Sequence, residues 1–209
     1  MLQITCMVLG PVETNVYLVV NEETKESFVV DPADHTDVIE EQIESTGATP
    51  TAILLTHGHY DHIGAAAALR ERYKIPVMVM KEEEELLECP QLNLSARHGF
   101  DTGLKADRLL NDGEEIAPAG VSIKVLHTPG HTGGGACYYL KEQGVLFAGD
   151  TLFKMSVGRT DFPTGDMNTL LESIREKLFV LPDETKVLPG HGPDTTIGFE
   201  KVHNFFLRS

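Results

Sequence analysis

Three short segments contain five of the nine histidines of this chain and could together form one reactive site. They are Thr-His-Gly-His-Tyr-Asp-His at Thr56–His62, Thr-Pro-Gly-His-Thr at Thr128–Thr132 and Pro-Gly-His-Gly at Pro189–Gly192. A fourth segment, Ala-Gly-Asp-Thr at Ala148–Thr151, contains Asp150. Each follows an apolar stretch that we expect to be a strand. Loops beyond the carboxyl ends of strands form the ligand crevice of α/β sheets, so the four loops can meet there.

The spacing of these residues predicts a site for two metal ions. Residues two apart in an extended chain point the same way, so the first two histidines of the Thr56–His62 motif can bind one ion. The Asp-His pair that follows turns aside and can bind a second ion. The predicted ligands are His57, His59 and His131 for the first ion, Asp61, His62 and His191 for the second, and Asp150 as a bridge between them.

The donor types indicate a catalytic site. Imidazole and carboxylate ligands without thiolate suit zinc, iron or manganese. We expect two divalent metal ions, with zinc as the first choice. The protein ligands leave a coordination position open for water, as in catalytic sites. Two cations that share one water lower its pKa towards neutrality and generate hydroxide.

The other histidines carry weaker signals. We expect His35, His98 and His203 to be solvated or core side chains without a direct role. His127 lies four residues before His131 and could support a metal ligand through a hydrogen bond.

The elements that must position these loops read as a mixed α/β pattern. Short β-branched runs closed by turn residues predict strands at Leu2–Leu9, Asn15–Val20 and Ser27–Val30. Apolar residues at helical spacing predict a helix from Thr36, with Gly47 directly after its end. The apolar run Thr51–Thr56 predicts a strand that enters the first histidine motif, and the Ala-rich run that follows predicts a helix.

The remaining segments continue this pattern. A strand is predicted at Pro76–Met80, and Lys81–Glu88 predicts a short acidic helix that forms a solvated face. Cys89–Lys105 has no clear period, as is common for binding loops. Further elements are predicted as a strand at Val121–Leu126, a hairpin of Ala136–Leu140 with Val145–Ala148, a helix capped by Asp166 and running to Leu178, and a strand at Lys186–Leu188.

Composition narrows the choice of partners. The 209 residues include 17 basic and 32 acidic side chains, a net charge of −15, which disfavours nucleic acid and anionic membrane surfaces. No apolar run reaches the about 20 residues of a membrane helix, and the first residues lack the pattern of a signal peptide. The three cysteines form no C-x-x-C pair. We expect a cytoplasmic protein that acts on a small molecule; its oligomeric state is left open.

The ligand order also resembles that of a known family. The His57-x-His59-x-Asp61-His62 motif, followed along the chain by His131, Asp150 and His191, is similar to the metallo-β-lactamase superfamily. The resemblance implies an α/β fold, a four-layer αβ/βα sandwich with a dinuclear site at the sheet edges. Asp31 in Val-Val-Asp-Pro-Ala resembles the buried aspartate that supports the motif loop in this family, although Ala33 stands where glycine is usual.

Within the superfamily, two segments resemble the glyoxalase II-like group, especially its short bacterial members. They are Gly149–Phe153 and Ser156–Phe162, the second of which contains Gly-Arg-Thr-Asp-Phe. Arg159 corresponds to a basic residue that contacts the glutathione carboxylate, or alternatively forms an ion pair with Asp161. Only 18 residues follow His191, so we expect one domain over residues 1–209, without a C-terminal glutathione-binding helical domain.

The resemblance implies a metal-dependent hydrolase of thioesters such as hydroxyacylglutathione, in which a metal-bridging hydroxide attacks and Asp61 orients it. One alternative is a sulfur dioxygenase that acts on glutathione persulfide and binds a single iron through His57, His131 and Asp150. A second alternative is a metal-binding or interaction protein without catalytic activity. The metal, the acyl group and the thiol carrier are left open by the sequence.

Overall fold

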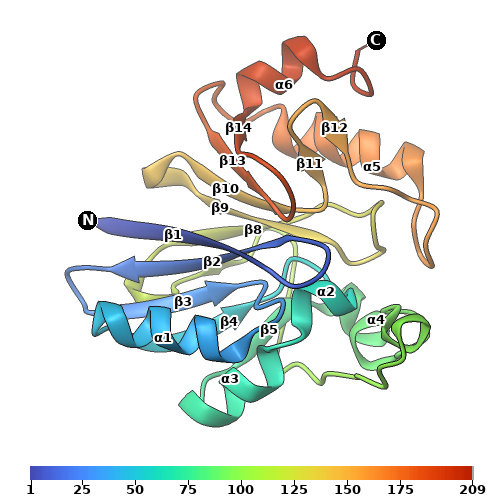
Figure 1. The fold of residues 1–209 in the computed structure, drawn as a ribbon. Coiled ribbons are helices and arrows are strands. Elements are labelled where there is room, and N and C mark those ends of the chain that lie inside the picture. Colours follow the sequence, from blue (N-terminus) through green and yellow to red (C-terminus); the bar gives the residue numbers. More distant parts are fainter. Residues whose placement is uncertain (209) are drawn as a thin grey trace.

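The computed structural model describes residues 1–208 and contains two mixed six-stranded sheets (Figure 1). The first sheet follows the chain order, β1-β2-β3-β4-β5-β6, with antiparallel pairing up to β3 and parallel pairing beyond it. Its strands are β1 (Leu2–Leu9), β2 (Thr14–Asn21), β3 (Glu26–Val30), β4 (Thr49–Leu54), β5 (Val77–Met80) and β6 (Arg108–Leu110).

The second sheet has the order β14-β13-β10-β9-β8-β7. Only β10 and β13 pair in parallel; the other neighbours are antiparallel. Its strands are β7 (Glu115–Ile116), β8 (Ile123–His127), β9 (Ala136–Leu140), β10 (Val145–Gly149), β13 (Lys186–Pro189) and β14 (Thr195–Thr196), and a separate hairpin consists of β11 (Leu152–Phe153) and β12 (Ser156–Val157).

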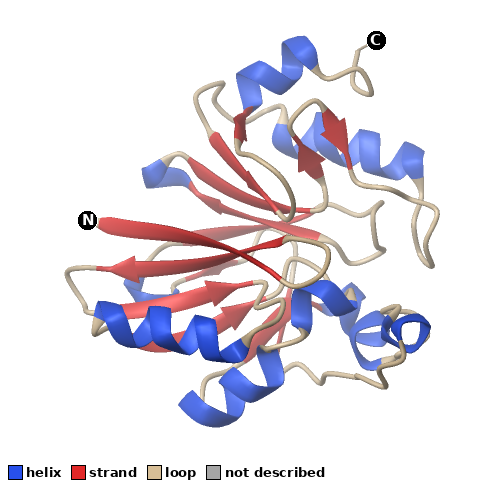
Figure 2. Cartoon of the chain, in the orientation of Figure 1, coloured by secondary structure: helices blue, strands red, loops and turns tan. Residues whose placement is uncertain are grey.

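Helices cover the outer sides of the two sheets (Figure 2). The α-helices are α1 (Thr36–Thr46), α2 (Tyr60–Ile63), α3 (Ala66–Tyr73), α4 (Glu84–Glu88), α5 (Met167–Ser173) and α6 (Ile197–His203). Short 3-10 turns are η1 (Lys81–Glu83), η2 (Ser95–His98), η3 (Pro118–Gly120) and η4 (Lys141–Gln143), and η5 (Ile174–Leu178) is a π-helical turn. In the part of the chain described here, the helices are too short or too polar to span a bilayer.

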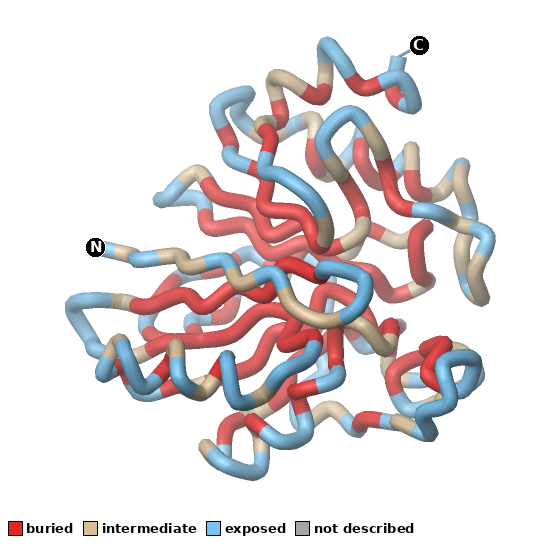
Figure 3. The backbone as a smooth tube through the Cα atoms, viewed as in Figure 1, coloured by how far each residue is buried: buried red, intermediate tan, exposed pale blue. Residues whose placement is uncertain are grey.

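Three apolar clusters lie between the four layers. Phe28 and Leu54 of the first sheet pack against Tyr138 and Phe147 of the second. A second cluster lies between the first sheet and helices α1 and α3, and a third between the second sheet and helices α5 and α6. Figure 3 shows the buried backbone concentrated in the central strands. The predicted αβ/βα sandwich is therefore confirmed.

Local sequence signals account for the ends of two helices. Helix α1 ends at Gly47, which has φ +65°, a conformation that glycine adopts without steric cost. The carboxylate of Asp166 accepts a hydrogen bond from Thr169 N at 2.8 Å and so caps α5 as predicted. The predicted helix to Leu178 is not uniform, because α5 passes into the π turn η5 at Ile174.

Two predictions near the first motif differ from the structure. The strand predicted to reach Thr56 ends at Leu54, because Thr56 N donates to the carboxylate of Asp31 and not to a neighbouring strand. Lys81–Glu88 is helical as predicted, but Glu83 is 0% exposed. The prediction of a solvated acidic face is therefore wrong for this residue.

The core between the sheets can be tested by truncation. Phe28 is 0% exposed in this cluster, so Phe28→Ala should lower the free energy of unfolding by about 3–5 kcal/mol. Phe205→Ala serves as the control, since Phe205 is 65% exposed and should change stability by less than about 0.5 kcal/mol. Urea unfolding at fixed metal loading measures both. Equal effects would contradict this packing.

Candidate metal centre

Three histidines from two loops form the first group of candidate ligands. His57 and His59 follow β4, and His131 lies in the loop between β8 and β9. One ligand atom from each lies within 4.8 Å of the others, and all three side chains are buried. The nearest pair is His59 Nδ1 and His131 Nε2, 3.0 Å apart. The structure thus brings together the residues predicted to hold the first ion.

The second group consists of Asp61, His62 and His191, whose ligand atoms also lie within 4.8 Å of one another. His191 Nε2 is 3.3 Å from Asp61 Oδ2 and 3.4 Å from His62 Nε2. Asp61 and His62 belong to the short helix α2, and His191 follows β13. This group lies closer to solvent than the first, because the side chain of His191 is 27% exposed.

Asp150 lies between the two groups. Its Oδ2 is 3.6 Å from His131 Nε2 and 3.6 Å from His191 Nε2, while Oδ1 is 3.5 Å from His62 Nε2. The residue follows β10, whose end is adjacent to the end of β13 in the second sheet. One carboxylate therefore contacts candidate ligands of both groups, which is the position predicted for a bridge.

The donor atoms fit metal ions better than they fit hydrogen bonds. Ligand atoms at about 2.0–2.1 Å from a tetrahedral ion lie about 3.3–3.4 Å from one another, and the distances above scatter around that value. His57 Nε2 and Asp150 Oδ1 are buried without a hydrogen-bond partner among the described residues. Buried polar atoms normally have a partner, so these atoms point to ligands that an ion would satisfy.

Hydrogen bonds at the far side of two of the rings orient these imidazoles. His131 Nδ1 donates to the carbonyl oxygen of Arg159 at 2.7 Å, and His191 Nδ1 donates to that of Val12 at 3.1 Å. A ring that donates through Nδ1 keeps the lone pair of Nε2 free. The free nitrogens are those that face the other candidate ligands.

Asp31 holds the first motif in place by accepting hydrogen bonds. Its Oδ1 accepts Thr56 N at 2.7 Å, and its Oδ2 accepts the Thr56 hydroxyl at 2.6 Å and His62 Nδ1 at 3.0 Å. The Thr56 hydroxyl in turn lies 3.1 Å from His57 Nδ1. The predicted supporting role of Asp31 is confirmed. Asp31 also lies close to His57 and His62. Its oxygens are already engaged in these hydrogen bonds, so the three residues do not form a third metal site.

The two groups differ in their electrostatic environment. Burial lowers the pKa of His57 and His59, the latter to about 3, so both imidazoles are neutral and able to bind a metal. Burial also disfavours the charged form of His62, but three surrounding aspartates raise its pKa to about 10. The second group therefore lies in a negative field that favours a bound cation.

Contacts from the first sheet hold the loop of His191. Asn15 at the start of β2 donates through Nδ2 to Pro189 O at 2.9 Å and to Gly192 O at 2.8 Å. Tyr17 Oη also donates to Pro189 O, at 2.7 Å. Neither residue was predicted from the sequence. The signal available in the sequence was Asn15, a polar amide at the start of an apolar strand. A buried amide requires hydrogen-bond partners, so it indicates a contact with another segment.

A groove of about 570 Å³ opens over the candidate ligands. The aperiodic segment Cys89–Lys105 lines it through Leu94, Arg97 and His98, consistent with the predicted binding loop. His98 stacks on Tyr60 with ring centroids 4.2 Å apart, a contact that the sequence analysis did not foresee. The segment thus forms one wall of the groove.

Arg159 and Arg97 both lie beside Phe162 in this groove. The guanidinium of Arg159 is 4.0 Å from the ring centroid and forms two hydrogen bonds with Asp161, at 2.7 and 2.6 Å. Arg97 lies 6.0 Å from the same ring. No acidic side chain of residues 1–208 forms an ion pair with Arg97. The ion pair with Asp161, given above as the alternative role of Arg159, is present. Arg97 is a second cation that was not predicted from the sequence.

The other histidines lie away from the ligand groups. His127 Nε2 donates to Gly133 O at 3.0 Å, a backbone atom of the loop that carries His131; among the described residues it forms no hydrogen bond to a candidate ligand, so the support predicted for a ligand is not found. His35 is an exposed residue before α1, and His203 is exposed at the end of α6. Neither is near a candidate ligand group.

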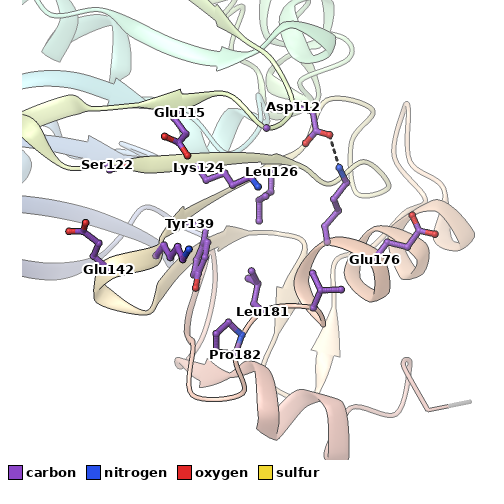
Figure 4. Close-up of a pocket in the computed structure, with 14 residues that line it drawn as sticks. Asp112, Glu115, Ser122, Lys124, Leu126, Tyr139, Glu142, Glu176, Leu181 and Pro182 are labelled. Carbon is purple, nitrogen blue, oxygen red and sulfur yellow. Dashed lines mark hydrogen bonds and ion pairs between the residues drawn. The ribbon is translucent and has the colours of Figure 1, made fainter.

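A second groove, also of about 570 Å³, is lined by residues of β8, β9 and η5 (Figure 4). Leu126, Tyr139 and Leu181 line it, and Lys177 forms an ion pair with Asp112 at 2.6 Å. None of its lining residues is a histidine or a cysteine. The chemistry that the sequence predicts therefore belongs to the groove over the ligands.

Comparison with known proteins assigns the family. Residues 9–191 match the model of the metallo-beta-lactamase superfamily. A probable metallo-hydrolase of Bacillus subtilis, YqgX, is 39% identical over 203 residues, which cover 96% of this chain and 95% of that protein. The hydroxyacylglutathione hydrolase GloC of Haemophilus influenzae is 37% identical over 191 residues, 90% of each chain.

Similar solved structures support the assignment to this family. The BLEG-1 B3 metallo-beta-lactamase superposes with a TM-score of 0.94 at 42% identity and covers 99% of this chain and 100% of its own. The di-iron-bound form of TTHA1623 has a TM-score of 0.87 at 38% identity and covers 97% and 100%. ETHE1 from Myxococcus xanthus has a TM-score of 0.80 at 30% identity and covers 97% and 83%.

The two ligand groups predict the metal content of variants. The wild-type protein should bind two divalent ions per chain, and His131→Ala or His191→Ala should each retain one, because each removes a ligand from one group. His203→Ala should retain two, since this exposed residue contacts neither group. Elemental analysis after zinc loading and gel filtration measures the content. Loss of an ion from His203→Ala would contradict the assignment.

Proposed function

This chain belongs to the metallo-β-lactamase superfamily, and we propose that it is a metal-dependent hydrolase of thioesters, of the hydroxyacylglutathione hydrolase type. The observation that carries the proposal is the position of Asp150 within 3.6 Å of candidate ligands from both groups. This pair of sites opens to a groove large enough for a small molecule. The identity to a relative named hydroxyacylglutathione hydrolase supports the choice of substrate.

Two zinc ions are the cofactors that we propose, although the donor set also suits iron or manganese. When bound, the ions supply a lowered pKa for a shared water and an electrophile for the carbonyl oxygen of the substrate. The residues that would hold them are His57, His59 and His131 for one ion, Asp61, His62 and His191 for the other, and Asp150 between the two.

Asp61 is the proposed catalytic residue because its carboxylate lines the groove. Burial favours its neutral form, but His62 and His191 hold the pKa of Asp61 below its ordinary value. An ionised carboxylate can only accept hydrogen bonds, so Asp61 can orient an attacking water by accepting a hydrogen bond from one of its O–H groups. The lone pair of the water oxygen then points towards the substrate.

The reaction adds water to the carbonyl carbon of the thioester and breaks the carbon–sulfur bond. The electron pair of that bond leaves with sulfur as a thiolate. Thiols have a pKa of about 8.5, so the thiolate is a stable leaving group and takes its proton from solvent. The products are a carboxylic acid and a thiol, and the chain needs no strong general acid for the departure.

The two arginines in the groove fit a substrate with a carboxylate. Arg159 already binds a carboxylate in the two-bond geometry that a substrate could adopt, with Asp161 as the partner it would exchange. Arg97 forms no ion pair with the described acidic side chains and offers a second guanidinium beside Phe162. We therefore propose that Arg159 binds the anionic end of the thiol carrier and that Arg97 assists it.

Hydrolysis can be measured as thiol release from lactoylglutathione. The zinc-loaded protein should catalyse the release, and Asp150→Asn should lose at least about 100-fold of the rate, because it weakens a ligand to both sites. His203→Ala should retain the wild-type rate. Absence of thiol release by the fully loaded wild-type protein would contradict the thioester proposal.

The same samples distinguish the alternatives. A chromogenic β-lactam tests the activity in the name of the BLEG-1 relative. Oxygen uptake with glutathione persulfide by an iron-loaded sample tests the dioxygenase, for which Gly158–Phe162 is the specific sequence observation. Turnover of either compound without thiol release from lactoylglutathione would replace the proposed function.

Arg97 provides a test of the substrate's charge. Arg97→Gln should raise KM for lactoylglutathione about 10-fold or more and leave kcat nearly unchanged, because a hydrogen bond to a charged group contributes about 1.5–3 kcal/mol. A thioester of N-acetylcysteamine, which has no carboxylate, should show no such change. Arg175→Gln, at an exposed position in η5, is the matched control. Equal changes for both substrates would argue against the anion site.

A further inference from the structure

Glu83 is a buried acid that the proposed reaction does not use. It belongs to a run of four glutamates, Glu82–Glu85, at the junction of η1 and α4. Glu82 and Glu85 are exposed, whereas the side chain of Glu83 is 0% exposed. A buried carboxylate is costly unless hydrogen bonds replace its water shell, so its partners indicate why it is there.

Those partners are two backbone N–H groups from two different loops. Oε1 of Glu83 accepts Gly58 N at 2.9 Å, and Oε2 accepts Gly134 N at 2.8 Å. Gly58 lies between His57 and His59, and Gly134 lies three residues after His131. The first loop follows β4 of one sheet, and the second connects β8 and β9 of the other. One carboxylate therefore links the two loops that carry the first ligand group.

Two glycines allow the η1–α4 segment to approach the two ligand loops closely. A Cβ atom at position 58 would lie 3.0 Å from Leu87 Cα and 2.9 Å from a methyl carbon of Leu86. A Cβ atom at position 134 would overlap the backbone nitrogen of Glu83. Glycine at both positions thus lets the η1–α4 segment reach the two N–H groups.

The second ligand group is held by other contacts. His62 is oriented by Asp31, and His191 by the carbonyl oxygen of Val12. Neither contact involves Glu83, whose hydrogen bonds to Gly58 N and Gly134 N both go to the loops of the first group. A change at Glu83 should therefore act on one group and leave the other in place.

We propose that Glu83 is a positioning residue for the first metal site, which fixes the separation of the His57–His59 loop from the His131 loop and so sets the affinity of that site. The inference rests on the metal centre of the proposed function but not on a thioester as the substrate. Hydrogen bonds around metal ligands typically change metal affinity by 10–100-fold when they are removed. We expect an effect of about that size, confined to the first site.

Glu83→Gln is the informative variant. Glutamine keeps the size of the side chain but offers one carbonyl oxygen, and its amide nitrogen would face one of the two N–H donors. Glu82→Gln and Glu85→Gln remove the same charge from exposed positions of the same run and serve as matched controls. Unfolding midpoints of the variants show whether each one folds.

Zinc affinity is measured by competition with a chelating indicator in two backgrounds. His191→Ala isolates the first site and His131→Ala isolates the second. Glu83→Gln should weaken zinc binding about 10–100-fold in the His191→Ala background and by less than about 3-fold in the His131→Ala background. Both control variants should match their parents. Excess zinc should restore thiol release by Glu83→Gln, which a loosened fold would not allow.

The possible outcomes distinguish the role of Glu83 from the metal centre and from the thioester substrate. Unchanged affinity at the first site, or equal loss at both sites, overturns the role of Glu83 while the metal centre stands. A wild-type protein that binds no zinc overturns the metal centre and this inference together. Predicted affinities without thiol release overturn the thioester substrate alone.

A second measurement needs no variant. In the zinc-loaded wild-type protein, the amide protons of Gly58 and Gly134 should resonate at low field and exchange slowly with solvent, because both donate to a buried carboxylate. Nuclear magnetic resonance of the labelled protein measures both properties. Rapid exchange of either proton overturns the shared hydrogen bonds, even where Glu83→Gln does not fold.

Discussion

The structure must bury imidazole and carboxylate side chains together. It must also leave free the lone pairs that would bind a metal and direct them at the same two positions. Polar groups removed from water need other partners, and a buried charge needs them most. Asp31 meets this constraint for the first motif by accepting Thr56 N, the Thr56 hydroxyl and His62 Nδ1. With these atoms engaged, the Nε2 atoms of His57 and His62 are left to face other candidate ligands or no partner at all. The hydrogen bonds around the ligands thus decide which atoms are available to a metal.

The constraint explains why the two sheets meet at the ligands. His57 and His62 follow a strand of the first sheet, while His131 and His191 follow strands of the second. Direct bonds join the two sides: Tyr138 Oη donates to Leu55 O at 2.7 Å, and Asn15 N donates to Gly190 O at 2.7 Å. The apolar core between the sheets sets their separation, and these polar contacts fix the loops. Packing and ligand geometry are therefore coupled.

The sequence predicted the ligand groups because each ligand lies in a short motif after an apolar strand, where periodicity and residue type agree. It did not predict Glu83, because a run of four glutamates is typical of a solvated face and no local pattern marks the buried one. Arg97 lies in an aperiodic segment, where its neighbours in space depend on the tertiary fold. The early end of β4 depends on Asp31, which is 25 residues from Thr56. What the sequence missed therefore depends on contacts between distant segments.

Charge balance connects the acidic composition to the proposed centre. The chain carries a net charge of −15, yet the proposed substrate is an anion. Four carboxylates are held in or around the two ligand groups, namely Asp31, Asp61, Glu83 and Asp150. Two divalent cations would offset the negative charge of these acids and so reduce the repulsion among them. Charges farther than about 8 Å are largely screened at physiological salt, so an incoming carboxylate responds mainly to the charges at the groove, which include Arg97 and Arg159. An acidic surface and an anionic substrate are then compatible.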